Sequence, residues 1–262
     1  MSDSPILTSE SPGKSALILG ATGAVGRHLL RELISTPHFT RVGEFGRRVT
    51  ALDSPYVPQI PEVKEKLKQG VVDFEKLSEE GEGKKLKEGG WDVVFITMGT
   101  TRKAAGSFEM FYKIDREYVV NAARAARTSS PTQRLVYLSS GGSSATSPFP
   151  YLRSKGLTEQ ELVSIGYPDT IIFRPGALAG ADRSGEPRLP EKVAVHVTNF
   201  LSLFTDSLQI QVSALGKAMR IAGQFGTAGL PASAQASKET FEGKMFTGIG
   251  NIGALGLAKE EL

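Results

Sequence analysis

The feature that most constrains the fold of this chain is an alternation of short apolar runs with stretches of helical spacing, over about 175 residues. The apolar runs fit buried strands at 15–19, 41–45, 71–74, 92–98, 135–139 and 170–174. Helical spacing falls between them, at 24–35, 62–69, 108–127 and 151–164. Strands that alternate with helices favour parallel βαβ units. We therefore predict an α/β fold with a doubly wound parallel sheet.

Residues 15–262 are predicted to form one domain, although the alternation weakens after Gly176. There we expect helices at 193–203 and 215–224 and a strand at 208–212, with 177–262 contributing a small C-terminal substrate-side layer. Residues 1–14 are rich in Ser and Pro and carry two acids, which fits neither a secretory signal nor a mitochondrial transit peptide. We expect them to be a disordered leader. The charged run at 75–88 is expected to be a solvated loop or helix face.

Composition excludes several classes of function. Hydrophobic residues make up 40% of the chain, enough for a packed core, and the absence of Cys excludes disulfides and thiolate metal sites. A formal net charge of +3 gives no argument for nucleic-acid binding, and no apolar run approaches the ~18–20 residues of a membrane span. The three His residues share no ligand spacing, so we expect no metal site.

A glycine-rich turn, Gly20-Ala21-Thr22-Gly23-Ala24-Val25-Gly26, joins the first predicted strand to the first predicted helix. Gly20 permits a tight turn, Gly23 lets a pyrophosphate approach the backbone, and Gly26 allows the helix to pack closely on the strand. The helix N-terminus offers free amides and a positive dipole end to phosphates. The turn indicates a Rossmann-type dinucleotide site, with a purely structural turn as the alternative. The expected contacts are Gly20, Thr22, Gly23, Ala24, Val25 and Gly26.

The end of the second predicted strand bears on which dinucleotide would bind. Arg47 and Arg48 follow this strand, and a pair of guanidinium groups can hold the 2′-phosphate of NADPH. Glu44 argues the other way, because a carboxylate near the strand end can bind the ribose hydroxyl of NAD. We predict NADPH, with NAD as the alternative.

Three side chains with the chemistry of a proton relay follow the fifth predicted strand. The strand ends in Ser139-Ser140, and Tyr151 and Lys155 open the next helix at i and i+4, on one face. A phenol with a pKa of ~10 needs a nearby ammonium to act as an acid or base near neutral pH. We predict Tyr151 and Lys155 as catalytic residues, beside a strand that ends in serines. A solvated surface position is the alternative for Tyr151 and Lys155.

Together these motifs resemble the short-chain dehydrogenase/reductase superfamily, and the resemblance covers residues 15–188. Further stretches resemble an atypical branch that includes the human HIV Tat-interacting oxidoreductase and fungal proteins first catalogued from the mitochondrial proteome. Those stretches are 71–77, Gly99-Thr100-Thr101-Arg102, 115–119, Tyr151-Leu152-x-x-Lys155-Gly156 and Phe173-Arg174-Pro175-Gly176.

The resemblance implies positions for the cofactor. NADPH would be held by the glycine turn, by Arg47 and Arg48, and by Met98 and Gly99 after the fourth strand. Asp73 and Phe74 would meet the adenine, Pro175 to Leu178 would cover the nicotinamide, and Arg188 would close over the phosphates.

The resemblance also implies roles in catalysis. Tyr151 would donate and accept the proton, and Lys155 would hold the nicotinamide ribose and lower the pKa of Tyr151. Ser140 would be the catalytic residue that binds the substrate carbonyl, with Ser139 as its rival. Many members have an Asn in the helix before the fifth strand, where this chain has Asp115. This departure weakens the expected proton relay but not the hydride transfer.

The function implied is an oxidoreductase that transfers hydride from NADPH to a small carbonyl substrate. One alternative is a regulatory or scaffold protein that binds NADPH without turnover, and another is an isomerase or epimerase. The fungal relatives imply a peripheral position on the cytosolic face of the mitochondrial outer membrane, with the cytoplasm as the alternative. The apolar face of 108–127 could pair two copies, so we expect a homodimer, although nothing in the sequence excludes a monomer.

Overall fold

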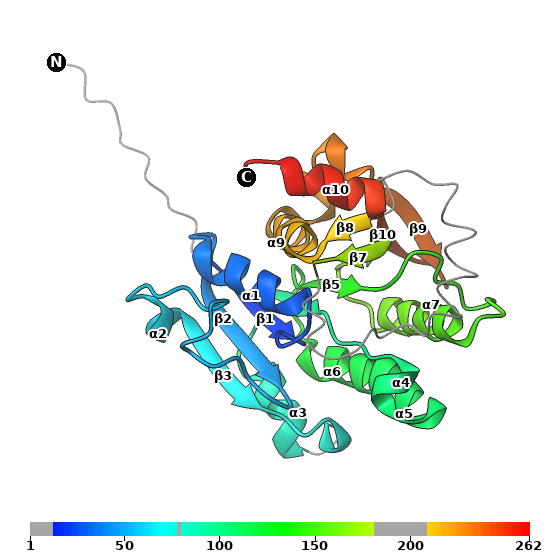
Figure 1. The fold of residues 1–262 in the computed structure, drawn as a ribbon, viewed down its shortest axis with the longest axis horizontal. Coiled ribbons are helices and arrows are strands. Elements are labelled where there is room, and N and C mark those ends of the chain that lie inside the picture. The colour runs from blue at the N-terminus through cyan, green and yellow to red at the C-terminus, as the bar shows by residue number, and fades with distance from the viewer. Residues whose placement is uncertain (1–12, 78–79, 181–208) are drawn as a thin grey trace.

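Eight strands form the central sheet in the described part of the computed structural model, which covers residues 13–77, 80–180 and 209–262. Their order is β3-β2-β1-β4-β5-β6-β10-β9, and all neighbours pair parallel except β9 and β10. The strands are β1 (Lys14–Leu19), β2 (Phe39–Gly46), β3 (Leu67–Val71), β4 (Val93–Ile96), β5 (Arg134–Leu138), β6 (Asp169–Arg174), β9 (Ser237–Phe241) and β10 (Lys244–Gly250). The predicted doubly wound α/β fold of Rossmann type is confirmed (Figure 1). The strand order shows that the winding reverses between β1 and β4.

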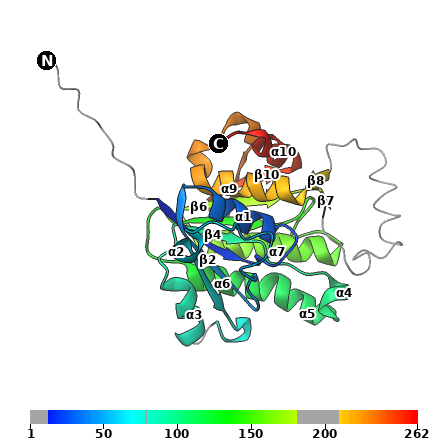
Figure 2. The same cartoon turned by 60° about the vertical axis from the view of Figure 1, so that its left-hand side comes forward.

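Helices cover both faces of the sheet, and each face has its own buried core (Figure 2). One face carries α1 (Gly26–Ser35), α2 (Val63–Lys66), α9 (Val212–Gly229) and α10 (Asn251–Lys259). The other face carries α3 (Glu80–Lys87), α6 (Tyr118–Ala126) and α7 (Pro150–Ser164). Between β4 and β5 lie α4 (Arg102–Ala105), α5 (Phe108–Tyr112) and a π-helical turn, Lys113–Glu117, that runs into α6. Two 3₁₀ turns span Phe74–Lys76 and Ala232–Ala234.

Alternation along the strands sends side chains into both cores. In β1, Ala16 and Ile18 belong to the core on the side of α1 and α9, whereas Leu17 and Leu19 belong to the core on the side of α6 and α7. All four side chains are fully buried. This explains why the strand reads as a continuous apolar run rather than as an alternating one.

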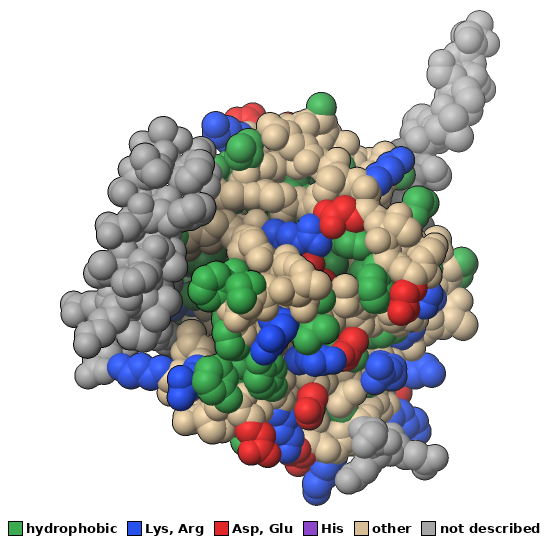
Figure 3. Space-filling view, turned by 90° about the vertical axis from the view of Figure 1, so that its right-hand side faces the viewer, with side chains coloured by type: hydrophobic (Ala, Val, Ile, Leu, Met, Phe, Trp, Pro, Cys, Tyr) green, Lys and Arg blue, Asp and Glu red, His purple; other side chains and the backbone are tan. Residues whose placement is uncertain are grey.

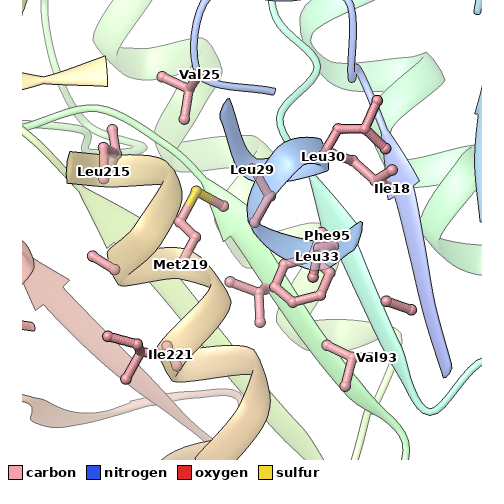
Figure 4. Packing of buried hydrophobic residues seen from close by; sticks show 14 of the residues in the cluster. Ile18, Val25, Leu29, Leu30, Leu33, Val93, Phe95, Leu215, Met219 and Ile221 are labelled. Carbon is pink, nitrogen blue, oxygen red and sulfur yellow. The ribbon is translucent and has the colours of Figure 1, made fainter. Parts of the chain in front are cut away.

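Helix α9 packs tightly against α1 and the sheet (Figure 4). At Gly216 a Cβ would lie 2.9 Å from the backbone nitrogen of Leu29, and at Gly223 a Cβ would lie 2.1 Å from the Phe95 ring. Met219 lies between these glycines and is fully buried. The missing side chains at the two glycines therefore allow the close approach of α9 to α1 and to β4.

Three predicted elements, the helix at 62–69, the strand at 71–74 and the helix at 108–127, differ from the structure. The helix predicted at 62–69 shortens to α2, and the strand predicted at 71–74 begins earlier as β3. Pairing with β2 decides this register, because Leu67 lies opposite Val42 and Val71 lies opposite Gly46. The single helix predicted at 108–127 contains the π-helical turn.

Most of the described C-terminal part of the chain, residues 209–262, extends the main fold, and its contribution to a substrate-side layer stays a prediction. Strand β10 pairs with β6, and α9 packs beside α1, so both belong to the central layers. Among the described residues, β7 (Ala177–Ala179) and β8 (Gln209–Gln211) form a separate parallel pair. The predicted strand at 208–212 and helix at 215–224 overlap β8 and α9. The helix predicted at 193–203 lies outside the described residues.

Much of the apolar face at 108–127, which was expected to pair two copies, is buried within one chain. Val119, Ala122 and Ala126 of α6 are 0% exposed because this helix lies on the sheet. A homodimer stays a prediction, but these side chains are not available for it.

Within the described ranges, no helix combines the length and apolar character needed to cross a membrane.

The packing of α9 predicts that Ala substitutions at two helical glycines differ in their effect on stability. Gly223→Ala should lower the free energy of unfolding by about 1–3 kcal/mol, because the new Cβ meets the buried Phe95 ring. Gly81→Ala is the matched control, since no atom of the described residues outside its own helix backbone and chain neighbours lies within 4 Å of a Cβ there. It should be neutral or stabilising by up to about 1 kcal/mol. Denaturant unfolding measures both, and equal effects would contradict the packing described.

Candidate functional site

The predicted site residues gather at one edge of the sheet. Gly20 follows β1, Met98 follows β4, Ser139 follows β5 and Pro175 follows β6, so all four lie at the carboxyl ends of neighbouring parallel strands. The winding of the sheet reverses between β1 and β4. A crevice at such a reversal is where ligands bind in open α/β sheets.

The glycine turn has the geometry that its sequence predicts. Gly20 has φ +95°, and a Cβ there would lie 2.7 Å from the Met98 backbone nitrogen. At Gly26 a Cβ would lie 2.1 Å from the Gly20 carbonyl oxygen. Helix α1 begins at Gly26, and Val25 before it supplies no capping side chain. The first turn of α1 is therefore open to a ligand phosphate, which fits a dinucleotide.

Arg47 and Arg48 are exposed directly after β2, as expected. Burial and a hydrogen bond to Glu75 raise the pKa of Tyr118 to about 12, although the nearby charge of Arg47 opposes this rise. Glu44 is only 1% exposed and is occupied internally, since its carboxylate accepts hydrogen bonds from Thr50 and from Gln69. The carboxylate that argued for NAD is thus committed to the protein itself.

Asp73 and Phe74 differ in their exposure to a ligand. Asp73 is exposed, and its carboxylate accepts a hydrogen bond from the Glu75 amide at 3.0 Å. The Phe74 ring is buried and stacks on Tyr118, with ring centroids 5.7 Å apart. Asp73 can therefore reach a cofactor with its side chain, whereas the Phe74 ring supports the loop from inside.

Tyr151 and Lys155 share the first turns of α7 but differ in burial. Tyr151 is 42% exposed, and its ring lies 5.9 Å from the buried ring of Phe111. Lys155 is 4% exposed. The phenol can thus meet a substrate, while the ammonium lies beneath the surface of the site.

Asp115 and Tyr137 hold Lys155, and neither was predicted from the sequence as a site residue. Its Nζ lies 3.0 Å from the Asp115 carboxylate and donates to the Tyr137 hydroxyl at 3.1 Å. Burial alone would lower the pKa of Lys155, but the surrounding oxygens outweigh burial and raise that pKa well above its ordinary value. An ammonium has three donor hydrogens, so one remains for a ribose hydroxyl or for Tyr151.

Gly99 brings the backbone after β4 against this buried pair. A Cβ at Gly99 would lie 3.4 Å from both Lys155 Nζ and the Asp115 carboxylate. Gly99 itself is exposed, so it separates the pair from the crevice without a side chain. The open glycine turn at Gly20–Gly26 and the Gly99 backbone over Lys155 fit the two ends of a nicotinamide dinucleotide.

The structure distinguishes the two serines that end β5. Ser139 is 6% exposed and its hydroxyl donates to the buried carboxylate of Glu159, which is also paired with Arg174. Ser140 is partly exposed, and its hydroxyl makes a long 3.4 Å contact with the Gly141 carbonyl. Ser140 is therefore the serine with a hydroxyl available to a substrate.

The remaining predicted contacts fall in different places. Pro175 is buried and its carbonyl accepts from the Gly141 amide at 2.7 Å, which ties the end of β6 to the loop after β5. Leu178 is partly buried in β7. Arg188 lies outside the described residues.

Tyr137 was missed because it reads as one more apolar residue of a buried strand. Asp115 was noted only as a departure from the family pattern. The sequence signal for Asp115 was its charge among the apolar positions of a helix. A buried acid needs a partner, so this position indicated a polar contact.

Comparisons with known proteins agree with this geometry. A family model described as NAD(P)H-binding matches residues 20–196. The protein FMP52 of Candida glabrata, described as mitochondrial, is 28% identical over 238 residues, which are 91% of this chain and 93% of that protein. The FMP52-1 protein of Scheffersomyces stipitis is 33% identical over 187 residues, 71% of this chain and 76% of that one. The rat protein HTATIP2 is 36% identical over 165 residues, 63% of each chain.

Solved structures show the same fold at low identity. The Bordetella bronchiseptica enzyme WbmF in complex with NAD+ aligns with a TM-score of 0.56 and 16% identity, covering 83% of this chain and 71% of that one. A Thermus thermophilus UDP-glucose 4-epimerase in complex with NAD aligns with a TM-score of 0.56 and 18% identity, covering 80% and 74%.

Fold, site and comparisons together define an NAD(P)H-binding Rossmann protein of the short-chain dehydrogenase/reductase type. Within that class, the chain belongs to the atypical family of the fungal FMP52 proteins and HTATIP2, as the sequence motifs predicted.

Proposed function

We propose that this protein is an NADPH-dependent reductase of a small carbonyl compound. The observation that carries the proposal is the position of Tyr151, exposed at the carboxyl edge of the sheet and backed by the buried Lys155. A phenol above an ammonium, next to a dinucleotide cradle, is the arrangement that carbonyl reduction needs.

When bound, NADPH would supply a hydride to the carbonyl carbon. The carbonyl oxygen would take its proton from the Tyr151 hydroxyl, and the tyrosinate left behind would regain a proton from solvent. Ser140 would orient the carbonyl oxygen by a hydrogen bond. Lys155 would hold a ribose hydroxyl with its remaining donor and so place the nicotinamide beside Tyr151.

We infer a substrate wall for an apolar or aromatic group from the exposed apolar side chains of α5, whose Phe111 ring packs near Tyr151, and from Phe149. Phe149 is 65% exposed, and Phe108 and Met110 of α5 are 40% and 38% exposed. Arg102 lies over the Phe108 ring at 4.0 Å. Figure 3 shows hydrophobic side chains gathered near Lys and Arg on the face of the molecule at the right of Figure 1, where α4, α5 and α7 lie.

The alternatives make different demands on the same residues. A scaffold that binds NADPH without turnover needs the glycine cradle but not the Tyr151 hydroxyl. An isomerase or epimerase would use Tyr151 and return the hydride to the same substrate, so it would consume no NADPH overall. The exposure of Tyr151 at this edge of the sheet favours an enzyme over a scaffold.

The names of the fungal relatives support a mitochondrial location for this protein. We place it on the cytosolic face of the outer membrane as a peripheral protein.

The choice of cofactor is tested by the two arginines after β2. NADPH should bind at least tenfold more tightly than NADH, about 1.4 kcal/mol, and Arg47→Ala/Arg48→Ala should abolish the preference. The control Arg31→Ala/Arg124→Ala removes two exposed arginines elsewhere and should keep it. Calorimetry with both cofactors measures the ratio. Equal binding of NADH by the unaltered protein would reject the assignment.

The proton donor is tested by two variants of α7. Tyr151→Phe should lower turnover of any substrate by about 10²–10⁴ and leave NADPH affinity nearly unchanged, because only the hydroxyl is lost. Lys155→Met should lower both, because it removes the ribose contact and the charge near Tyr151. NADPH oxidation and cofactor titration separate the two effects. Full activity in Tyr151→Phe would show that another group donates the proton.

The substrate wall is tested at its most exposed ring. Phe149→Ser should raise KM for an aromatic ketone about five- to tenfold, roughly 1–1.4 kcal/mol, while NADPH affinity stays constant. Met245→Ser is the matched control, because Met245 is 74% exposed on β10, outside the candidate site. An unchanged KM in Phe149→Ser would remove Phe149 from the substrate site.

A further inference from the structure

A buried ion pair lies beneath the candidate site. Lys155, one of its members, has a role in the proposed reduction, whereas Asp115 has none there. Asp115 is 0% exposed and Lys155 is 4% exposed, and their charged atoms are 3.0 Å apart. The contact with Lys155 is the only polar side-chain contact of this carboxylate among the described residues. Burying an acid with a single partner costs free energy, and this cost points to a role for Asp115 in the site.

The backbone holds this carboxylate in place. Asp115 is the middle residue of the π-helical turn, and the Thr158 hydroxyl of α7 contacts its backbone carbonyl at 3.4 Å. A π-helical turn widens a helix locally and is often found at functional sites. Asp115 thus reaches Lys155 from the helix that faces α7.

Three ionisable groups face Lys155 in the described chain: Tyr137 from β5, Asp115 from the π-helical turn, and Tyr151 from its own helix. Burial raises the pKa of Tyr137 above the ordinary phenol range, so Tyr137 is a neutral hydroxyl near physiological pH. The charges that matter are therefore those of Asp115, Lys155 and Tyr151.

Counting these charges shows what Asp115 does to Tyr151. With Asp115 and Lys155 both ionised, the cluster is neutral as long as Tyr151 is a phenol. Loss of the Tyr151 proton then leaves one uncompensated negative charge beside buried groups, which is unfavourable. Without the Asp115 charge, the same ionisation would turn a positive cluster into a neutral one.

We propose that Asp115 is a positioning residue that neutralises Lys155 and keeps Tyr151 in its phenol form, so that the site works as a proton donor in carbonyl reduction. This inference rests on the proposed reductase function and adds the direction of the reaction. Reduction needs the phenol, which gives its proton to the carbonyl oxygen as the carbonyl carbon takes the hydride from NADPH. Alcohol oxidation by NADP+ needs the tyrosinate, because the alcohol must lose its proton to a base.

The first experiment titrates tyrosinate by its ultraviolet absorbance in the full chain. The Tyr151 signal is the difference between a protein and its Tyr151→Phe counterpart. In Asp115→Asn this signal should appear at least one pH unit lower than in the unaltered protein, a tenfold change in the ionisation constant or about 1.4 kcal/mol. Asp53→Asn makes the same chemical change at an exposed position and should leave the signal where it was.

The second experiment remains informative if Asp115→Asn folds poorly. Thermal unfolding is compared for Asp115→Asn, Lys155→Met and the double variant. Because each single change leaves a buried charge without its partner, the double variant should lose less stability than the two single losses combined. Additive losses would overturn the charge pairing.

These measurements need no substrate, so they test Asp115 separately from the proposed function. A Tyr151 signal that stays in place or moves to higher pH in Asp115→Asn would overturn the proposal. If a substrate is found, Asp115→Asn should move the pH profile of alcohol oxidation down by at least one unit. Loss of reduction and oxidation together, with unchanged profiles, would instead mean a structural role only.

Discussion

The close contact between the start of α1 and the ends of β1 and β4 is the constraint on which the rest of the site depends. Gly20 takes a positive φ, and Gly26 lies so close to the Gly20 carbonyl that a Cβ would reach 2.1 Å from its oxygen. The Thr97 hydroxyl of the next loop donates to the same carbonyl at 3.1 Å. This contact joins the two strands at which the winding reverses, and it opens the first turn of α1 toward the crevice.

Charged groups buried behind this edge keep the rest of the site in order. Lys155 is held by Asp115 and Tyr137, and Glu159 ties Ser139 to Arg174. Both clusters involve α7, whose first turn presents Tyr151. Removing one partner of such a pair costs more than the pair contributes, because a buried charge is left alone. The exposed residues Tyr151 and Ser140 are thus supported by groups that a substrate would not touch.

Much of the fold and part of the site could be predicted from the chain alone. Strands β1, β2, β4, β5 and β6 follow from their apolar runs, because parallel strands are buried on both faces. The glycine turn and the Tyr151 and Lys155 spacing follow from local backbone and helix geometry. Strand β3 was misplaced, since Lys68, Gln69 and Gly70 carry no apolar signal and only pairing with β2 makes them a strand.

The sequence by itself determined the elements and motifs whose physics is local: buried strands, a turn that only glycine permits, and two side chains one helical turn apart. Tertiary structure decided which charges meet. Asp115 and Lys155 are 40 residues apart in sequence, and only the packing of the π-helical turn against α7 places them 3.0 Å from each other. Burial then gives the pair its effect, because it removes the solvent that would otherwise screen the two charges. The same packing committed Glu44 to Thr50 and Gln69, and so left Arg47 and Arg48 as the charged residues exposed just beyond β2.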